Sequence, residues 1–304
     1  MRTGGGDRVR ANPISYAVSG PLKGPSSPGS SPTARARDLV LVHGWCCDRS
    51  QMAPLGEALE QDYRVLTLDL RGHGQSQDFE EDGSVGAGRG RVDADRPAPT
   101  GQVATTIAEH AADVLAVCEA AELTDPVVIG HSMGALVALA TLARADSPQR
   151  RAPGRPWQPA GAVLLDPAPI ARERGKEFWA SQVEPVRRDD TGDLRREFAR
   201  ALVLPTDRAD YGQTVEVMAS VHPEVAAGGA MAMATFDGAG VLGQLALPAL
   251  VIHAASAERG LEQLVPDRSL LTLGRTVGAG HFHHLEVPEQ VVPMIRRWLE
   301  VALP

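Results

Sequence analysis

A serine stands between two glycines in the stretch Gly-His-Ser-Met-Gly at residues 130–134, after an apolar run and before a helical pattern. This spacing matches G-x-S-x-G, in which a strand turns sharply into a helix and holds the serine in a strained backbone conformation. Glycines on both sides remove the Cβ atoms that would clash. The helix that follows points its N–H groups and positive dipole end at the space above Ser132, where they stabilise negative charge. We therefore predict that Ser132 is a nucleophile and not simply a turn residue.

Nucleophilic chemistry at a serine needs supporting groups. The hydroxyl is a weak nucleophile near neutral pH, so it requires a base within hydrogen-bond reach and a third group that orients this base. An oxyanion hole requires two N–H donors aimed at the developing negative oxygen. The backbone N–H of Met133, the residue after the serine, is expected to supply one of them. Cys46 and Cys47 are nucleophiles by residue type, but nothing near them in the sequence indicates an activated thiolate.

The elements that would position these groups alternate along the chain, which is typical of a mostly parallel sheet with helices on both faces. Short apolar or alternating runs predict strands within residues 14–20, 38–44, 63–74, 125–130, 160–166 and 247–254. Helical spacing of apolar residues predicts helices within residues 52–61, 105–123 and 291–303. Two polar stretches, at about residues 21–37 and 80–100, lack apolar periodicity and are expected to be mobile surface loops.

A mixed helical pattern fills residues 170–243, between the last two predicted strands. We interpret this segment as a helical cap or lid inserted into one core, which consists of residues 1–169 and 244–304. The large apolar residues of the segment either line a pocket or form ordinary core, and we favour the second interpretation; they are Phe178, Trp179, Phe198, Tyr211, Met231, Met233 and Phe236.

The composition limits which partners and which cellular compartment we expect for this protein. A net charge of −8 without a dense basic run argues against nucleic-acid binding. Three cysteines, two of them adjacent, form neither a disulfide framework nor a zinc pattern, which indicates a reducing cytoplasm. The sequence contains neither a signal-peptide pattern nor a run of about 18 apolar residues, so we expect neither export nor membrane insertion. Because we find no phosphate loop, dinucleotide fingerprint or metal-ligand cluster, we expect no cofactor, no metal and a small-molecule substrate.

Four segments together carry a resemblance to a known fold. They are LVLVHGWCCD, LDLRGHGQS, VVIGHSMG and VGAGHFHHLEVPEQV, and they resemble the His-Gly loop, the Arg-Gly turn, the nucleophile elbow and the histidine segment of α/β-hydrolase-fold proteins. The resemblance extends over nearly the whole chain and implies the α/β-hydrolase fold. It implies that His281, directly after a glycine, is the base, and that His283 and His284 are not. It also implies that the backbone N–H of Trp45, the residue after His-Gly, is the second oxyanion donor.

The position of the catalytic acid departs from the family's pattern. Its usual place is a Gly-x-x-Asp loop after the penultimate strand, but here Ala254 and Ala257 occupy the glycine and aspartate positions. Three carboxylates keep the order serine, acid, histidine along the chain: Asp166, Asp237 and Glu258. We favour Asp166, because it ends the strand after the nucleophile strand and active-site groups gather at the carboxyl ends of parallel strands. The alternative is that Asp166 only caps a turn, which would leave the role to one of the other two or to no residue.

The resemblance implies a hydrolase that cleaves small esters, lactones or related carbonyl compounds through an acyl-Ser132 intermediate. The HGWCCD segment and an acid after the earlier strand are also similar to cofactor-independent dioxygenases that cleave N-heteroaromatic rings. Those proteins use a His-acid pair to deprotonate a hydroxylated substrate, which O₂ then attacks without a metal. A non-catalytic binding protein on the same fold is disfavoured because Ser132 and His281 are both present. The sequence leaves the substrate, the conformation of the cap and the oligomeric state open.

Overall fold

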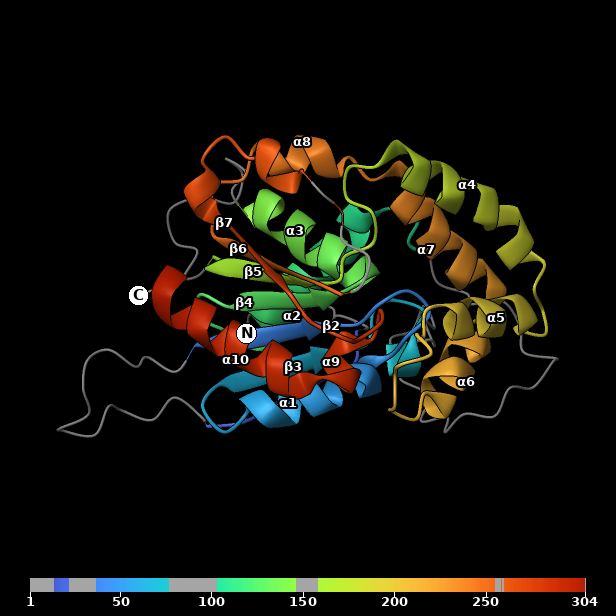
Figure 1. The fold of residues 1–304 in the computed structure, drawn as a ribbon, viewed down its shortest axis with the longest axis horizontal. Coiled ribbons are helices and arrows are strands. Elements are labelled where there is room, and N and C mark those ends of the chain that lie inside the picture. The colour runs from blue at the N-terminus through green and yellow to red at the C-terminus, as the bar shows by residue number, and fades with distance from the viewer. Residues whose placement is uncertain are drawn as a thin grey trace, which may run out of the picture.

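The computed structural model of the chain describes residues 14–21, 37–76, 103–145, 158–254, 258 and 260–303. Strands from these residues form one seven-stranded sheet in the order β1-β3-β2-β4-β5-β6-β7 (Figure 1). The strands are β1 (Tyr16–Ser19), β2 (Asp38–Val42), β3 (Arg64–Leu68), β4 (Val127–His131), β5 (Gly161–Leu165), β6 (Ala249–His253) and β7 (Leu271–Arg275). Strand β1 pairs antiparallel with β3, and the other neighbours are parallel. The predicted mostly parallel sheet is therefore confirmed.

Side chains alternate along each strand, so the central strands contribute to apolar cores on both faces of the sheet. On β2, Leu41 joins the core on one face and Val42 joins the core on the other. Helices cover both faces, with α1 (Ala53–Leu59) and α10 (Pro288–Ala302) on the Leu41 face and α2 (Ile107–Ala120) and α3 (Met133–Ala145) on the Val42 face (Figure 1). The prediction of helices on both faces is confirmed.

Several helices follow one another between β5 and β6, and we call residues 170–243 the helical insertion. The helices of the insertion are α4 (Glu173–Arg187), α5 (Asp193–Ala201), α6 (Gly212–Ser220), α7 (Pro223–Thr235) and α8 (Gly238–Leu242). In Figure 1, α4 to α7 lie beyond one end of the sheet, with α4 alongside α7 and α5 alongside α6, whereas α8 lies near α3. The insertion is thus placed next to the strand ends where the predicted site residues are found.

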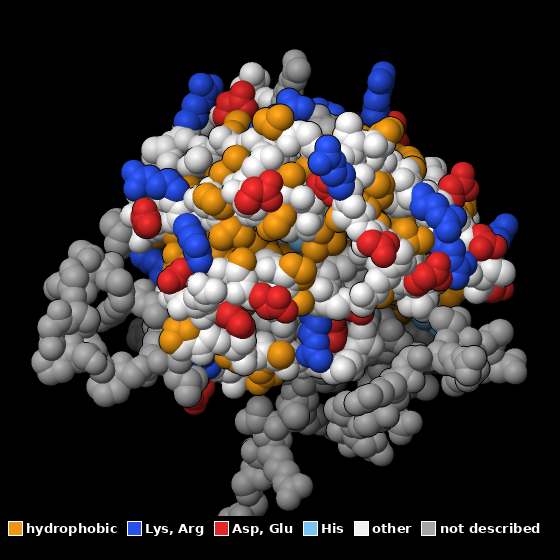
Figure 2. Space-filling view, turned by 60° about the horizontal axis from the view of Figure 1, so that its bottom comes forward, with side chains coloured by type: hydrophobic (Ala, Val, Ile, Leu, Met, Phe, Trp, Pro, Cys, Tyr) orange, Lys and Arg blue, Asp and Glu red, His pale blue; other side chains and the backbone are white. Residues whose placement is uncertain are grey.

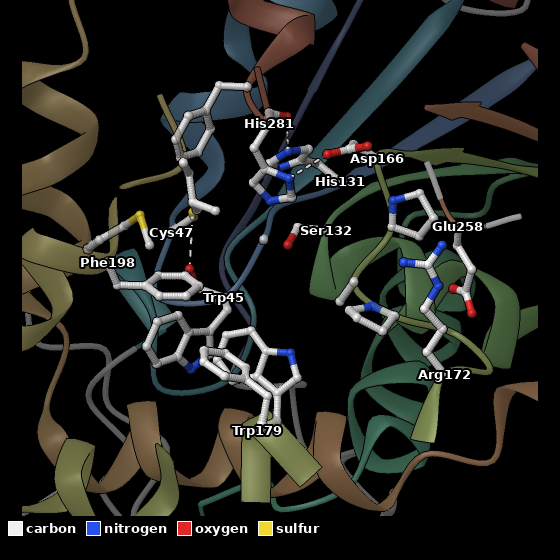
Figure 3. Close-up of a pocket in the computed structure, with 18 residues that line it drawn as sticks. Trp45, Cys47, His131, Ser132, Asp166, Arg172, Trp179, Phe198, Glu258 and His281 are labelled. Carbon is white, nitrogen blue, oxygen red and sulfur yellow. Dashed lines mark hydrogen bonds and ion pairs between the residues drawn. The ribbon is translucent and has the colours of Figure 1, made fainter. Parts of the chain in front are cut away.

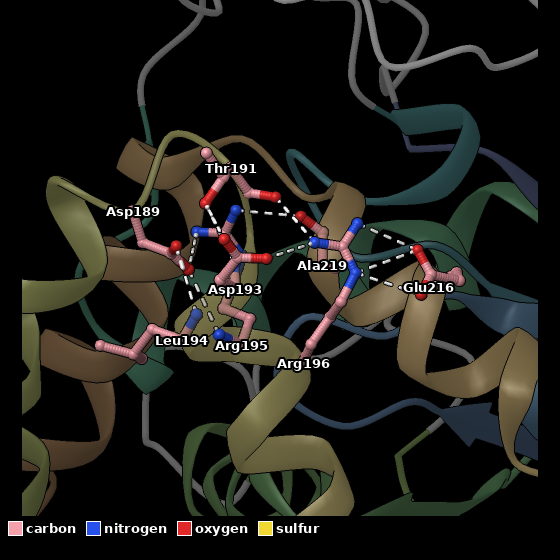
Figure 4. A network of polar contacts seen from close by, with 8 residues as sticks. All are labelled: Asp189, Thr191, Asp193, Leu194, Arg195, Arg196, Glu216 and Ala219. Carbon is pink, nitrogen blue, oxygen red and sulfur yellow. Dashed lines mark hydrogen bonds and ion pairs between the residues drawn. The ribbon is translucent and has the colours of Figure 1, made fainter.

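A buried ion pair lies at the start of α5, and its arginine also makes a hydrogen bond to α6 (Figure 4). The Arg195 guanidinium, only 1% exposed, lies 3.4 Å from Asp189 Oδ2 and donates from Nη2 to Ala219 O at 2.9 Å. Asp189 also accepts the backbone N–H groups of Leu194 and Arg195 at the start of α5. Breaking a buried pair by removing one partner leaves an uncompensated charge, so this network fixes α5 relative to α6.

The observed elements also show what the sequence pattern misses. Strand β7 was not predicted, because it is a short edge strand whose side chains are exposed or half-buried and which contains Gly274. The predicted mobile loops, at about residues 21–37 and 80–100, fall almost entirely outside the described residues. On the face in Figure 2, basic and acidic side chains of the described residues are intermixed.

Candidate active site

The turn from β4 into α3 carries Ser132, whose backbone has a positive φ of 55°. A Cβ added to Gly130 would lie 1.9 Å from Gly134 O, and one added to Gly134 would lie 2.4 Å from the carbonyl oxygens of Val42 and His43. These contacts are backbone atoms that no side-chain movement relieves. The two glycines therefore allow the strand and helix to approach closely enough to form the sharp turn, as the G-x-S-x-G pattern predicts.

His281 lies on the loop between β7 and α9 (His283–Glu286), and its Nδ1 is 2.7 Å from Asp166 Oδ2 (Figure 3). Asp166 directly follows β5, with a positive φ of 35°. Its Oδ1 accepts the N–H of Ala254 at 2.8 Å, and its own N–H donates to Ile252 O at 2.8 Å. The carboxylate is thus held between the ends of β5 and β6 and faces the imidazole.

Burial by itself would raise the pKa of Asp166. The hydrogen bond and electrostatic attraction from His281, together with the N–H of Ala254, outweigh this effect and hold the pKa below its usual value. Asp166 is therefore ionised near neutral pH, and it accepts the Nδ1–H of His281. This tautomer leaves the other ring nitrogen, Nε2, unprotonated and able to accept a proton.

Ser132 and His281 line the same cavity, and Figure 3 shows both side chains directed into it. Among the described residues, no hydrogen bond joins Ser132 Oγ to His281 Nε2. Such contacts are often long in the absence of substrate and shorten only in the complex. The structure brings Ser132, His281 and Asp166 together at the carboxyl ends of β4 and β5.

The neighbouring histidines have different surroundings. Burial lowers the pKa of His283 to about 4 and lowers that of His131 and His284 well below the usual value, so all three are neutral. His131 Nε2 is 3.0 Å from the backbone oxygen of His281, and His283 Nδ1 is 3.1 Å from Thr276 Oγ1. None of the three makes a hydrogen bond or ion pair with a carboxylate among the described residues. Their arrangement supports a packing role around His281.

The backbone around Trp45 lies beside the serine. A Cβ added to Gly44 would be 3.2 Å from Ser132 Cβ, which shows how closely the two segments approach. Met133 is the first residue of α3, where backbone N–H groups have no partner within the helix. The Trp45 indole donates to Ala226 O at 2.8 Å, which fixes this loop against α7. Both predicted oxyanion donors thus belong to segments that adjoin Ser132.

The cavity has a volume of about 290 Å³. One side is formed by the aromatic wall (Trp45, Trp179 and Phe198), whose rings meet edge to face with centroids 5.1 to 5.4 Å apart. Other lining residues come from the helical insertion and the adjoining loops: Arg172, Phe178, Leu202, Met218, Glu258 and Phe282. Of the apolar insertion residues considered above, Phe178, Trp179 and Phe198 line this cavity. The expectation of ordinary core is incomplete for Trp179 and Phe198, which also pack in the core, and wrong for Phe178, which is 44% exposed.

The other carboxylates considered for the acid role have different partners. Glu258 accepts the N–H groups of Ile170 and Ala171 at 2.8 and 3.1 Å. Asp237 accepts the N–H of Gly240 at 3.0 Å and caps the start of α8. Neither contacts His281 within the described residues, and Ala257 lies outside those residues.

Neither cysteine next to the site is activated. Burial raises the pKa of the Cys46 and Cys47 thiols well above the usual value, so both are protonated near neutral pH.

In the described ranges, no three His, Cys, Asp or Glu side chains are placed to hold a metal ion. No described helix is long and apolar enough to cross a membrane.

Comparisons with known proteins identify a matching family and similar folds. Residues 39–294 match the Alpha/beta hydrolase family. The fold is similar to that of a thermophilic esterase from Thermogutta terrifontis, with a TM-score of 0.67 and 23% identity over 96% of this chain and 94% of that one. It is also similar to an enol-lactonase from Burkholderia xenovorans, with a TM-score of 0.69 and 20% identity over 94% of this chain and 96% of that one.

A shorter sequence match is to a pimeloyl-acyl-carrier protein methyl ester esterase from Stenotrophomonas maltophilia, which is 44% identical over 46 residues. This match covers 15% of the chain and only 18% of the relative's length. The family match, in contrast, includes every segment that forms the site described above. The chain therefore belongs to the α/β hydrolase family.

Proposed function

We propose that the protein is a serine hydrolase of small esters, lactones or related carbonyl compounds. Ser132 is the nucleophile, His281 the general base and Asp166 the acid that orients it. The observation that carries this proposal is the 2.7 Å contact between His281 Nδ1 and Asp166 Oδ2 beside a serine held at positive φ. An ionised Asp166 fixes the histidine tautomer and stabilises the imidazolium that forms as the serine proton moves.

The reaction follows from this arrangement. Ser132 Oγ attacks the substrate carbonyl while His281 Nε2 takes its proton, and the resulting oxyanion accepts the backbone N–H groups of Trp45 and Met133. Each such donor contributes about 3 kcal/mol to stabilising the transition state in comparable sites. His281 then protonates the leaving alcohol, and water activated by the same histidine hydrolyses the acyl-Ser132 ester.

The size and surface of the cavity suggest the class of substrate. Its volume of about 290 Å³ is close to the lower end of the range of about 300–1,000 Å³ that is usual for small-molecule pockets. The aromatic wall favours a flat or apolar group over a charged one. We therefore propose compact substrates with an apolar or aromatic arm on one side of the carbonyl.

We also propose that residues 170–243 act as a cap over a core of residues 1–169 and 244–304. Trp179 on α4 and Phe198 on α5 support this role, because these insertion residues form part of the cavity wall. Closing such a segment over a site excludes water and strengthens the electrostatic interactions within it.

Labelling with a fluorophosphonate probe followed by mass spectrometry tests the proposal. We expect covalent labelling of Ser132 in the wild type, and loss of both labelling and ester hydrolysis in Ser132→Ala. His281→Ala should lose most turnover with 4-nitrophenyl acetate. Wild-type rates in both variants would contradict the mechanism.

An oxygen electrode separates the proposal from the dioxygenase interpretation. The Asp166–His281 pair would also deprotonate a hydroxylated aromatic substrate, but that reaction consumes O₂ and does not need Ser132. Stoichiometric O₂ consumption during turnover would therefore replace the hydrolase proposal. A protein that is neither labelled nor active on esters and lactones would indicate a binding function.

A further inference from the structure

A segment of the helical insertion contacts the loop that carries His281. We call residues 202–211, between α5 and α6, the α5–α6 segment, and residues 276–282 the histidine loop. Asp207 Oδ1 accepts the N–H of Gly280 at 3.0 Å, and Leu202 O accepts the N–H of His281 at 3.3 Å. The two backbone groups held in this way belong to the proposed base and to the residue directly before it.

The same segment also holds the helix that follows the histidine loop. Glu286 accepts the N–H groups of Arg208 and Ala209 at 2.7 and 2.8 Å, and the hydroxyl of Tyr211 at 2.9 Å. Both sides of His281 along the chain are therefore attached to the α5–α6 segment. The contacts join residues more than seventy positions apart in the sequence.

The approach of the two segments is close. A Cβ added to Gly280 would lie 2.6 Å from Asp207 Oδ2 and 2.9 Å from Leu202 O. Asp207 is itself oriented by Leu204, which donates its N–H to Asp207 Oδ2 at 2.8 Å and accepts the Asp207 N–H at 3.0 Å. Residue 280 thus has no room for a side chain while the carboxylate keeps this position.

His281 is held from the sheet as well. Its ring contacts Asp166 at the end of β5, and its carbonyl oxygen is 3.0 Å from Nε2 of His131 at the end of β4. The ring is therefore oriented by the sheet, whereas the backbone N–H groups at 280 and 281 are held by the insertion. Removing the second set of contacts leaves the imidazole paired with Asp166 but free to shift relative to Ser132.

We propose that the α5–α6 segment positions the catalytic base, and that Asp207 is the positioning residue in this segment. The inference rests on the proposed function, because it assumes that His281 is the base. It adds that the insertion does more than cover the cavity: the base reaches its working position only when the α5–α6 segment lies against the histidine loop. Asp207 acts through Gly280 and has no contact with the reacting atoms.

The first test compares two carboxylates of the same segment in the full-length protein. Asp207→Ala removes the acceptor of the Gly280 N–H, whereas Asp210→Ala removes a carboxylate that caps Gly212 and does not touch the histidine loop. Because a displacement of about 1 Å can cost about 10²-fold in rate, we expect Asp207→Ala to lower kcat for 4-nitrophenyl acetate about ten- to hundredfold. KM should stay within about twofold, since the cavity wall is unchanged, and Asp210→Ala should keep the wild-type kcat.

Two further variants keep the test valid if Asp207→Ala does not fold. Asp207→Asn retains an oxygen that can accept the Gly280 N–H, so it should recover part of the lost kcat. Gly280→Ala forces the two segments apart and should lower kcat in the wild-type background. The same change should cost less in the Asp207→Ala background, where the carboxylate that the new Cβ would meet at 2.6 Å is gone, and a double-mutant cycle measures this coupling.

The outcomes separate this inference from the proposed function. If Ser132 and His281 are required but Asp207→Ala and Asp210→Ala have equal kcat, the positioning role is overturned and the hydrolase proposal stands. Fully additive effects of the changes at 207 and 280 would overturn it as well. If the wild type is not labelled at Ser132, both proposals are overturned. A selective loss of kcat in Asp207→Ala, partly restored by Asn, supports the positioning role.

Discussion

At the scale of single residues, the most informative position is the carboxylate beside the histidine. Strands β5 and β6 are parallel neighbours, with Leu165 paired to Ile252, so their carboxyl ends lie side by side. A carboxylate at the end of β5 therefore reaches nearly the same place as one on the loop after β6, and the N–H of Ala254 holds it there. The chain order and the strand end pointed to Asp166 from the sequence, but the partners of Glu258 required the folded structure.

The roles of the two carboxylates predict opposite effects of neutral substitutions. Asp166→Asn places an amide against His281 Nδ1 and favours the wrong tautomer, which costs about 10⁴-fold in turnover in a serine protease. We expect a loss of that order in kcat/KM with a small change in Tm. Glu258→Gln should keep kcat but lower Tm slightly, because it weakens the contacts with the N–H groups of Ile170 and Ala171. Steady-state kinetics and thermal melting compare the two, and the reverse ranking would return the acid to the loop after β6.

The aromatic wall predicts a change in substrate preference. Trp179→Ala removes an indole that packs edge to face on Trp45 and Phe198, contacts worth about 0.5–1.5 kcal/mol for an aromatic pair. We expect kcat/KM for phenyl acetate to fall about tenfold relative to that for ethyl acetate, which corresponds to about 1.4 kcal/mol. Phe236→Leu changes an insertion residue outside the cavity lining and is the control. An equal loss for both esters in Trp179→Ala would show that the wall has only a structural role.

At the scale of elements, the sequence predicts the central strands, whose apolar runs are visible in it. It misses features that depend on where a segment lies in the fold. The central strands are buried on both faces and appear as continuous apolar runs, which is why they were found. Edge strand β7 lacks such a run. Within the helical insertion the sequence indicated helices but no bounds, because its apolar residues serve the core, the cavity or both. The α5–α6 segment is joined to the histidine loop and to α9 by the carboxylates of Asp207 and Glu286, but the N–H groups they accept belong to the backbone, so the sequence does not reveal the pairing.

The close packing where β4 turns into α3 predicts that alanine destabilises the protein at Gly134, in this turn, but not at Gly56, in α1. A Cβ at Gly134 would press on two backbone carbonyl oxygens at 2.4 Å, so Gly134→Ala should destabilise the fold by about 1–3 kcal/mol and also displace Ser132. The control, Gly56→Ala, lies within α1 and would meet Leu41 Cδ1 at 3.4 Å, an ordinary contact. Alanine is the better helix former there, so we expect equal or higher stability. Urea unfolding measures both, and equal stability of the two variants would contradict the close packing at the junction.

At the scale of the whole molecule, the protein buries several neutral histidines outside the proposed chemistry. Burial lowers the pKa of His43 to about 4 and those of His73 and His110 to about 3. The unfolded chain takes up protons at these residues below about pH 6.5, whereas the folded protein does not until much lower pH. The free energy of unfolding should therefore decrease as pH falls through this window.

His110 offers the clearest test of this pH dependence. Its side chain on α2 is buried, and neither ring nitrogen has a hydrogen-bond partner among the described residues. His110→Leu removes one titrating group without leaving a polar partner unpaired, so the slope of the unfolding free energy between pH 6.5 and 4 should become shallower by up to about 1.4 kcal/mol per pH unit. Urea unfolding at several pH values measures the slope. Parallel curves for the variant and the wild type would mean that His110 is not held neutral by the fold.

The half-buried contacts of Glu258 limit how this protein can be recombined with its relatives. Glu258 follows β6 in the core, yet its carboxylate binds the N–H groups of Ile170 and Ala171, where the helical insertion begins. These hydrogen bonds join the start of the helical insertion to the residues after β6, in addition to the contacts between the α5–α6 segment and the histidine loop. A chimera that exchanges residues 170–243 for those of another hydrolase would keep these two hydrogen bonds only if backbone N–H groups of the grafted segment reached Glu258.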